Sequence, residues 1–384
     1  MDKFATTSTV KRWTNKVLIF LFAILLWLPV LDIFFHIDWT APRSENRAMA
    51  PYPKLHNGWR GLQEYVAGLE EYFNDHFGCR KCLVNWQIKM RLFLFNDKNT
   101  RGVIIGKDGW LFTTDCQMVE HYDGQLQFTP EQLHDWKVLI EKRRDWLARR
   151  GIAYVFVVVP DKQTIYPEEL PDWVTKVRPQ TELDQFFAYM HEHSTVPVLD
   201  VRDVLRDAKT NCPVYMKTDT HWNFLGGFVA YQELIRTLVH LVPALELEPL
   251  PLADFSVTNR FQPGGDMART LGSSMTETNY YTLTPTVELP KIIYRMPSLE
   301  HYQDPGYIGN SQAHGRLIIF HDSFAGAWFP LLPYNFNQII SRWQYELDPV
   351  LVEQNKPDVV VTEMLERFFN VQDPKKIMAK EALN

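Results

Sequence analysis

The stretch "YVFVVV", residues 154–159, is a short continuous run of β-branched and aromatic residues. Such a run is typical of a strand that is buried on both faces of a parallel sheet. Three further runs have the same character: "VPVLD" at 196–200, "RLIIF" at 316–320 and "PDVVVTE" at 357–363. The sequence therefore predicts a sheet built from at least these four segments.

Helical patterns lie between the predicted strands. Thr129 and Pro130 are suited to begin a helix, and apolar residues then recur on one face until Gly151. Residues 226–242, "GGFVAYQELIRTLVHLV", have the spacing of a second helix. Strands that alternate with helices predict an α/β sandwich around a mainly parallel sheet.

A nucleophile and a base occur next to these elements. The strand at 316–320 runs directly into "HDSFAG", so Ser323 lies at a strand-to-helix turn that would expose its hydroxyl. Asp219 and His221 lie two apart in "KTDTHWN", so an extended backbone would project both side chains to one side. We therefore predict Ser323 as nucleophile, His221 as general base and Asp219 as the carboxylate that orients it.

Other interpretations of these residues stay open at this stage. Asp219 and His221 could ligate a metal with His301 or His314, although no metal-binding spacing is present and we expect no metal. His321 is a rival base because it lies two residues from Ser323.

We expect the oxyanion of an acyl intermediate to be bound by backbone N–H groups near Ser323 and Phe324. Glu363 and Arg367 have the i, i+4 spacing of an ion pair along a helix.

The N-terminal region predicts a membrane anchor. Residues 17–35 are apolar except for Asp32, and basic residues precede them, which favours a cytoplasmic N-terminus at 1–16. A cleaved signal peptide is the rival interpretation. Residues 36–57 are polar and Pro-rich, as in a tether, and we assign 58–384 to one catalytic domain, with helical spacing over 58–96.

Charge and cysteine content restrict the function further. The 384 residues include 40 basic and 46 acidic side chains, a net charge of −6, which argues against nucleic-acid binding. In an exported domain disulfides can persist, and the pairing of Cys79, Cys82, Cys116 and Cys212 stays open, with Cys116–Cys212 as one long-range candidate.

Several motifs in one order carry a family resemblance. They are "ENR" (45–47), "FNDHFGCR" (73–80), "VIIGKDGWLF" (103–112), "VPDKQTIYPE" (159–168), "TDTHWN" (218–223), "GGDMARTLG" (264–272), "HDSF" (321–324) and "KPDVVVTEMLERF" (356–368). With them the chain resembles the SGNH hydrolase-like polysaccharide O-acetyltransferases of the AlgJ/AlgX group, from about residue 44 onward. The short segment after the last predicted strand and the anchor resemble the AlgJ branch more than AlgX. His321 departs from the Gly that commonly precedes "DSF" in the group.

The resemblance implies an SGNH-like fold with the permuted order Asp219, His221, Ser323, and an acetyl-serine mechanism without a cofactor. It implies acetylation of an exported polysaccharide, alginate first and cellulose second, by a single-pass inner-membrane protein whose catalytic domain lies in the periplasm. The implied partners are a membrane-bound O-acyltransferase that supplies acetyl groups and other polysaccharide acetylation and export proteins. A membrane-anchored acetylesterase and a non-catalytic scaffold are the alternatives.

An anionic polymer would require local positive charge on a chain that is negative overall. Lys162 follows the strand at 154–159, and Arg342 lies beyond the strand at 316–320. We predict that these two residues contact the polymer and that Tyr215 stacks on a sugar ring. Solvated charge and core packing are the simpler interpretations.

Overall fold

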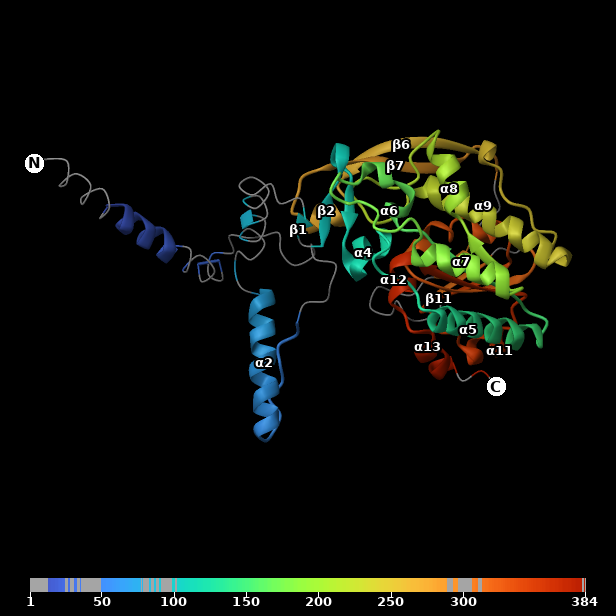
Figure 1. Cartoon of the computed structure of the whole chain (residues 1–384), viewed down its shortest axis with the longest axis horizontal. Helices are drawn as coiled ribbons and strands as arrows, with labels where there is room; N and C mark the ends of the chain where they lie inside the picture. The colour runs from blue at the N-terminus through green and yellow to red at the C-terminus, as the bar shows by residue number, and fades with distance from the viewer. Residues whose placement is uncertain are drawn as a thin grey trace, which may run out of the picture. The chain divides into compact units, whose positions relative to one another are not determined.

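Figure 1 shows the computed structural model of the chain. It describes residues 13–24, 50–76, 99–100, 102–288, 293–295, 306–309 and 313–381, and the scattered positions 27, 31–32, 35, 78, 83, 86–87, 90 and 383. The chain divides into two compact units, residues 1–101 with 269–273 and residues 102–268 with 274–384. The domain that we predict at 58–384 therefore includes residues of both units.

The first unit contains α2 (Trp59–His76) and β1 (Asn99–Thr100). The helical spacing over 58–96 is thus confirmed for α2, and most of the remainder lies outside the described residues. Residues 13–24 are helical, but the predicted span at 17–35 falls only partly on described positions. Within those positions, no helix combines the length and apolarity that a membrane crossing requires.

The second unit is built on a sheet with the strand order β5-β4-β12-β10-β11-β9-β8. The first five strands run parallel, and β9 and β8 are antiparallel additions at one edge. The bounds are β4 (Ala153–Val159), β5 (Val198–Asp200), β8 (Ile293–Arg295), β9 (Gly306–Gly309), β10 (Arg316–His321), β11 (Gln338–Trp343) and β12 (Val359–Leu365). All four predicted strands are confirmed, as is the mainly parallel α/β architecture.

Both faces of this sheet are covered, which explains the unbroken apolar runs of its strands. In β4, Val155 and Val157 pack into one buried cluster, while Phe156 and Val158 pack into a second cluster on the opposite face. Helix α9 (Phe224–Leu241) contributes to the first cluster and helix α5 (Pro130–Ala148) to the second. Figure 1 shows α9 and α8 (Arg202–Lys209) on one side of the unit, and α5, α11 (Pro349–Asn355) and α13 (Pro374–Glu381) on the other.

The two predicted helices are also confirmed. Helix α5 begins after Thr129, whose hydroxyl accepts a hydrogen bond from the Gln132 N–H while the Gln132 side chain accepts from the Thr129 N–H. The helices of the second unit are α4 (Met118–Tyr122), α5 (Pro130–Ala148), α6 (Lys162–Ile165), α7 (Glu182–His193), α8 (Arg202–Lys209), α9 (Phe224–Leu241), α11 (Pro349–Asn355), α12 (Glu366–Val371) and α13 (Pro374–Glu381); α10 covers Asp266–Thr270.

Two smaller strand pairs were not predicted. Strands β2 (Val103–Ile105) and β3 (Leu111–Thr113) form an antiparallel pair, as do β6 (Phe255–Pro263) and β7 (Thr276–Pro285). The β6–β7 ribbon is separate from the seven-stranded sheet.

The candidate disulfide between Cys116 and Cys212 is wrong, because both cysteines are free and partly exposed. Cys79 and Cys82 lie outside the described residues.

Candidate active site

Two loops bring the predicted catalytic residues together. Ser323 is the first residue of the short 3₁₀ turn η7 (Ser323–Ala327), which a single residue, Asp322, separates from the end of β10. Asp219 and His221 lie in a tight loop that is closed by a bridge between Tyr215 and Trp222. This loop precedes α9, whose first turn is capped by the Asn223 side chain.

The three side chains form a continuous hydrogen-bonded chain. His221 Nε2 lies 2.8 Å from Ser323 Oγ, and His221 Nδ1 lies 2.7 Å from Asp219 Oδ1. In a base that receives the serine proton at Nε2, Nδ1 carries a hydrogen, and Asp219 is placed to accept it. The contact between Asp219 and His221 that their two-residue spacing predicts is thus present in the structure.

Asp219 is held from several directions. Its Oδ2 accepts a hydrogen bond from the Asp266 N–H at 2.8 Å, and its Oδ1 also accepts from the His221 N–H at 3.1 Å. Burial alone would raise the pKa of Asp219, but the hydrogen bond and charge of His221 and these N–H donors outweigh it and lower the pKa to about 2. Asp219 is therefore ionised at neutral pH, as an orienting carboxylate must be.

Asp266 is a second carboxylate at the site, and residue-by-residue reasoning missed it. Its Oδ2 lies 3.9 Å from His221 Nδ1 and accepts the Thr220 hydroxyl at 2.5 Å, while its Oδ1 accepts the Thr220 N–H at 2.8 Å. The available signal was the motif "GGDMARTLG", in which Asp266 is the only acidic residue.

Asp219, Asp266 and His221 are also close enough to one another to ligate a metal ion. Ligand atoms of Asp219, His221 and Asp266 lie within 4.8 Å of one another. Both ring nitrogens of His221 already contact Asp219 and Ser323, so an ion bound there would compete with the hydrogen-bonded chain.

Glu277 of β7 fixes the backbone of the loop that contains Asp219 and His221. This fully buried carboxylate accepts hydrogen bonds from the Lys217 N–H at 2.9 Å, the Thr218 N–H at 2.7 Å and the Thr218 hydroxyl at 2.6 Å. It also accepts the Asn279 N–H at 2.8 Å. The loop that presents Asp219 is thereby tied to the β6–β7 ribbon.

The turn that carries Ser323 is built around Asp322. One carboxylate oxygen of Asp322 accepts the Phe324 N–H at 3.0 Å, and the other accepts the Tyr345 hydroxyl at 2.7 Å and the Leu365 N–H at 2.8 Å. The Phe324 N–H, one of the two expected oxyanion donors, is therefore already bonded within the protein. Of the predicted pair, the Ser323 N–H is the donor that remains.

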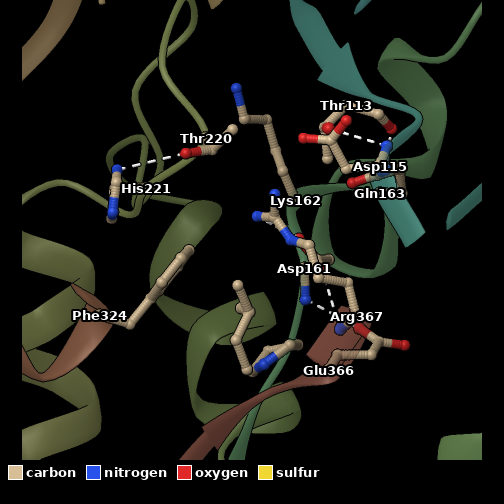
Figure 2. Close-up of polar contacts among 12 residues, drawn as sticks. Thr113, Asp115, Asp161, Lys162, Gln163, Thr220, His221, Phe324, Glu366 and Arg367 are labelled. Atoms are coloured by element: carbon tan, nitrogen blue, oxygen red, sulfur yellow. Dashed lines mark hydrogen bonds and ion pairs between the residues drawn. The ribbon is translucent and has the colours of Figure 1, made fainter. Parts of the chain in front are cut away.

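The predicted helical ion pair between Glu363 and Arg367 is wrong. Glu363 lies in β12, where it is fully buried and accepts the Asp322 N–H at 3.0 Å, and burial followed by the nearby Asp322 charge raises its pKa. Arg367 lies in the following helix and pairs with Asp161 at 2.7 Å. Figure 2 shows Arg367 directed toward Asp161. The boundary at Leu365 breaks the helical spacing that the prediction assumed.

Two of the predicted polymer contacts are buried. Lys162 is 2% exposed, and its Nζ donates to the Leu111 carbonyl at 2.9 Å and the Lys217 carbonyl at 3.3 Å. Figure 2 shows its side chain extending toward the loop that carries Thr220. Tyr215 is 0% exposed and donates its hydroxyl to the Pro160 carbonyl at 2.5 Å. A polymer cannot reach either side chain, so we withdraw them as substrate contacts.

Arg342 and His321 differ in their accessibility. Arg342 is partly exposed in β11, and its Nε donates to Gln344 Oε1 at 3.1 Å, so its contact with substrate stays a prediction. His321 is 3% exposed, its Nδ1 lies 2.6 Å from the Asp322 carbonyl oxygen, and burial lowers its pKa. It is a buried residue under the turn, while His221 is the imidazole that contacts Ser323 Oγ.

A cavity of about 170 Å³ opens beside Ser323. Its walls are largely aromatic or small and apolar, and Phe224 meets Tyr280 edge to face at 6.1 Å between ring centroids. The lining residues are Met216, His221, Trp222, Asn223, Phe224, Tyr280, Ser323, Phe324, Gly326 and Ala327. An ester that enters this cavity would bring its carbonyl carbon to Ser323 Oγ.

Comparison with solved structures supports the fold. Bacillus cereus PatB1, in a structure with a sulfonyl adduct, shares 17% sequence identity with a TM-score of 0.55, covering 73% of this chain and 99% of that one. At this identity the likeness concerns the fold.

Comparison at the sequence level finds similar proteins over a little less than half of the chain. Residues 103–292 match the family "SGNH hydrolase-like domain, acetyltransferase AlgX". Two relatives, each named "Probable alginate O-acetylase AlgJ", come from Pseudomonas aeruginosa (31% identity; 43% of this chain and 40% of the relative) and Pseudomonas syringae (30%; 48% and 45%). The matched part spans less than half the length of these relatives. Over residues 103–292 the chain is therefore similar to the AlgX/AlgJ group of SGNH hydrolase-like acetyltransferases.

Proposed function

We propose that this protein is an O-acetyltransferase that modifies hydroxyl groups of an exported polysaccharide through an acetyl-serine intermediate. The observation that carries the proposal is the unbroken chain Asp219–His221–Ser323, with contacts of 2.7 and 2.8 Å, at the wall of an open cavity. The name of the AlgJ relatives makes alginate the first acceptor to test.

The first half-reaction forms the intermediate. Ser323 Oγ attacks the carbonyl carbon of an acetyl ester or thioester while its proton passes to His221 Nε2. The oxyanion that develops is stabilised by backbone donors, of which the Ser323 N–H is the predicted one. The bond to the leaving group then breaks, and His221 returns the proton to that group.

The second half-reaction uses the same residues in reverse. A sugar hydroxyl gives its proton to His221 Nε2 and attacks the acetyl carbon, and the bond to Ser323 Oγ breaks as that oxygen regains the proton. The ionised Asp219 stabilises the imidazolium in both halves. Water in place of the sugar would give an acetylesterase, and the partial exposure of His221 makes this the second candidate.

The donor and the cellular location belong to the same proposal. Acetyl-CoA is not available outside the cytoplasm, so a membrane-bound O-acyltransferase would supply the acetyl groups to a domain anchored at the inner membrane. The basic residues before the apolar segment at 17–35 support this orientation.

The test is to follow acetate release and acetyl transfer in parallel with the full chain. A small activated acetyl ester is the donor, alginate oligosaccharides are the acceptor, and mass spectrometry reads the products. We expect both acetate and acetylated oligosaccharide with the wild type, and at least a roughly 10³-fold loss of both in Ser323→Ala. Ester turnover by Ser323→Ala at the wild-type rate would refute the enzyme assignment. Acetate without transfer, with or without the membrane partner, would select the esterase.

A further inference from the structure

The β6–β7 ribbon presents an exposed face next to the catalytic cavity. Six consecutive residues of β6, from Ser256 to Phe261, are exposed, and Phe261 stands out at 75%. Figure 1 shows β6 and β7 side by side as a long, narrow ribbon. Neither β6 nor β7 pairs with a strand of the seven-stranded sheet, so this surface is not required to build the core of that sheet.

Tyr280 of β7 links the ribbon to the cavity. It is one of the lining residues, and it packs edge to face against Phe224 at the start of α9. The residue directly opposite Tyr280 in β6 is Arg260. Opposite residues of an antiparallel pair project from the same face, with Cβ atoms about 5 Å apart. Arg260 therefore lies on the side of the ribbon that borders the cavity.

The charge of Arg260 is not neutralised by a neighbouring carboxylate. Among the residues that the structure describes, no acidic side chain forms an ion pair or hydrogen bond with its guanidinium. The carboxylates nearest the reaction centre are otherwise occupied, since Asp219 bonds His221 and Asp266 bonds Thr220. An unpaired guanidinium is thus exposed on the ribbon face that also carries Tyr280, in a chain whose net charge is −6.

We propose that Arg260 and Tyr280 form the subsite that binds an acidic sugar of the acceptor polysaccharide. The guanidinium presents a planar fork of donors that matches a sugar carboxylate bidentately, and the aromatic ring offers a flat apolar surface to the sugar ring. Binding there places a neighbouring hydroxyl of the same chain over the cavity that contains Ser323. The role is one of specificity and positioning, since neither residue touches the reacting atoms.

This inference rests on the proposed function for the acceptor, but binding can be measured without turnover. The protein is the full chain with Ser323→Ala, titrated with a uronic-acid oligosaccharide and with the same oligosaccharide whose carboxyl groups are reduced to alcohols. Arg260→Gln removes the charge, and Arg260→Lys keeps the charge but loses the fork. Arg236→Gln is the matched control, because Arg236 is half-exposed, pairs with Glu233 and lies about 18 Å along α9 from Phe224.

We expect Arg260→Gln to weaken binding of the acidic oligosaccharide at least tenfold and to leave the neutral one little changed. Arg260→Lys should fall between, and Arg236→Gln should match the parent. Tyr280→Ala should weaken binding of both oligosaccharides, because the ring does not read charge. Equal effects of Arg260→Gln on both oligosaccharides, or an effect no larger than that of Arg236→Gln, would overturn the proposal.

Failure of the proposed subsite can be distinguished from failure of the proposed acetyl transfer. If the wild type fails to form an acyl-enzyme while binding still depends on Arg260, the reaction fails and the subsite stands. If transfer occurs but acidic and neutral acceptors bind equally well, the subsite fails and the reaction stands. Thermal unfolding of each variant checks that it is folded, and Arg260→Lys provides a second test if Arg260→Gln is not.

Discussion

At the residue scale, His221 uses both of its ring nitrogens, one toward Asp219 and one toward Ser323. The sequence predicted this trio because Asp-x-His spacing and a post-strand serine each follow simple backbone rules. The same reasoning failed for Lys162 and Tyr215. A polar residue after a strand can turn inward when carbonyl groups from distant loops meet it, and those loops are not visible in the local sequence.

The two histidines near Ser323 should respond differently to substitution. His221→Ala should reduce hydrolysis of a small acetyl ester as strongly as Ser323→Ala, and the double variant should be little worse, because members of a triad act as a unit. His321→Gln should retain most of the activity, since His321 bonds the Asp322 carbonyl and not the nucleophile. If His221→Ala retains most of the esterase activity while His321→Gln is inactive, the general base is His321 and our assignment is wrong.

Lys162 should give the protein a measurable pH dependence of stability. Burial lowers the pKa of Lys162 to about 7, despite the opposite effect of the Asp219, Asp266 and Glu277 carboxylates. A lysine in the unfolded chain titrates near 10.4. Between these values the unfolded state binds more protons than the folded state, so the free energy of unfolding rises with pH by up to about 1.4 kcal/mol per unit.

The measurement is urea unfolding of the wild type and Lys162→Met at pH 7, 8 and 9. The variant lacks this titration, so the wild type should gain stability relative to it as the pH rises, even if the two differ at pH 7 through the lost hydrogen bonds. A difference that stays constant or shrinks with pH would show that Lys162 is charged throughout.

At the scale of elements, the site depends on backbones that approach closely. A Cβ at Gly265, just before α10, would lie 2.3 Å from the Asp219 Cβ and 2.5 Å from its Oδ2. The glycine thus permits the segment to pass directly behind the orienting carboxylate, where the Asp266 N–H reaches Asp219. A Cβ at Gly227 would lie 2.3 Å from that of Ala327, so α9 needs glycine to pack against the turn that presents Ser323.

Gly265→Ala should therefore impair catalysis more than it impairs folding. Overpacking of this kind costs about 1–3 kcal/mol of stability, whereas a shift of about 1 Å in a catalytic group can cost roughly 100-fold in rate. The control is Gly264→Ala, whose Cβ would clash with Ala268 and the Met275 carbonyl instead of Asp219. Ester hydrolysis and urea unfolding are measured for both variants. A rate loss no greater in Gly265→Ala than in Gly264→Ala would contradict this role.

At the scale of the whole molecule, the strands that form unbroken apolar runs were predictable and the strands that polar residues interrupt were not. β4, β10 and β12 are continuous apolar runs because helices bury both of their faces. β11 contains Ser341 and Arg342, which interrupt its apolar pattern, and β6 is mostly polar because solvent covers it. Arg260, which we propose to select the acceptor, lies on this exposed strand, where burial leaves no signal in the sequence.

The membrane topology is a separate prediction about the whole chain. A reporter enzyme that works only outside the cytoplasm should be active when fused after residue 60, and one that works only in the cytoplasm should be inactive. The reason is that basic residues precede the apolar segment at 17–35. N-terminal sequencing of the membrane fraction is the accompanying control. A mature N-terminus near Pro51 would replace the anchor with a cleaved signal peptide.

The central claim is that Ser323, activated by His221, is a working nucleophile, and covalent labelling tests it most directly. The full chain is incubated with a small sulfonyl fluoride, which reacts with activated serines, and the intact mass and the modified peptide are then measured. We expect one adduct per chain, located on Ser323, absent in Ser323→Ala and formed at least about 100-fold more slowly in His221→Ala. An adduct on another residue, or labelling of His221→Ala at the wild-type rate, would contradict it.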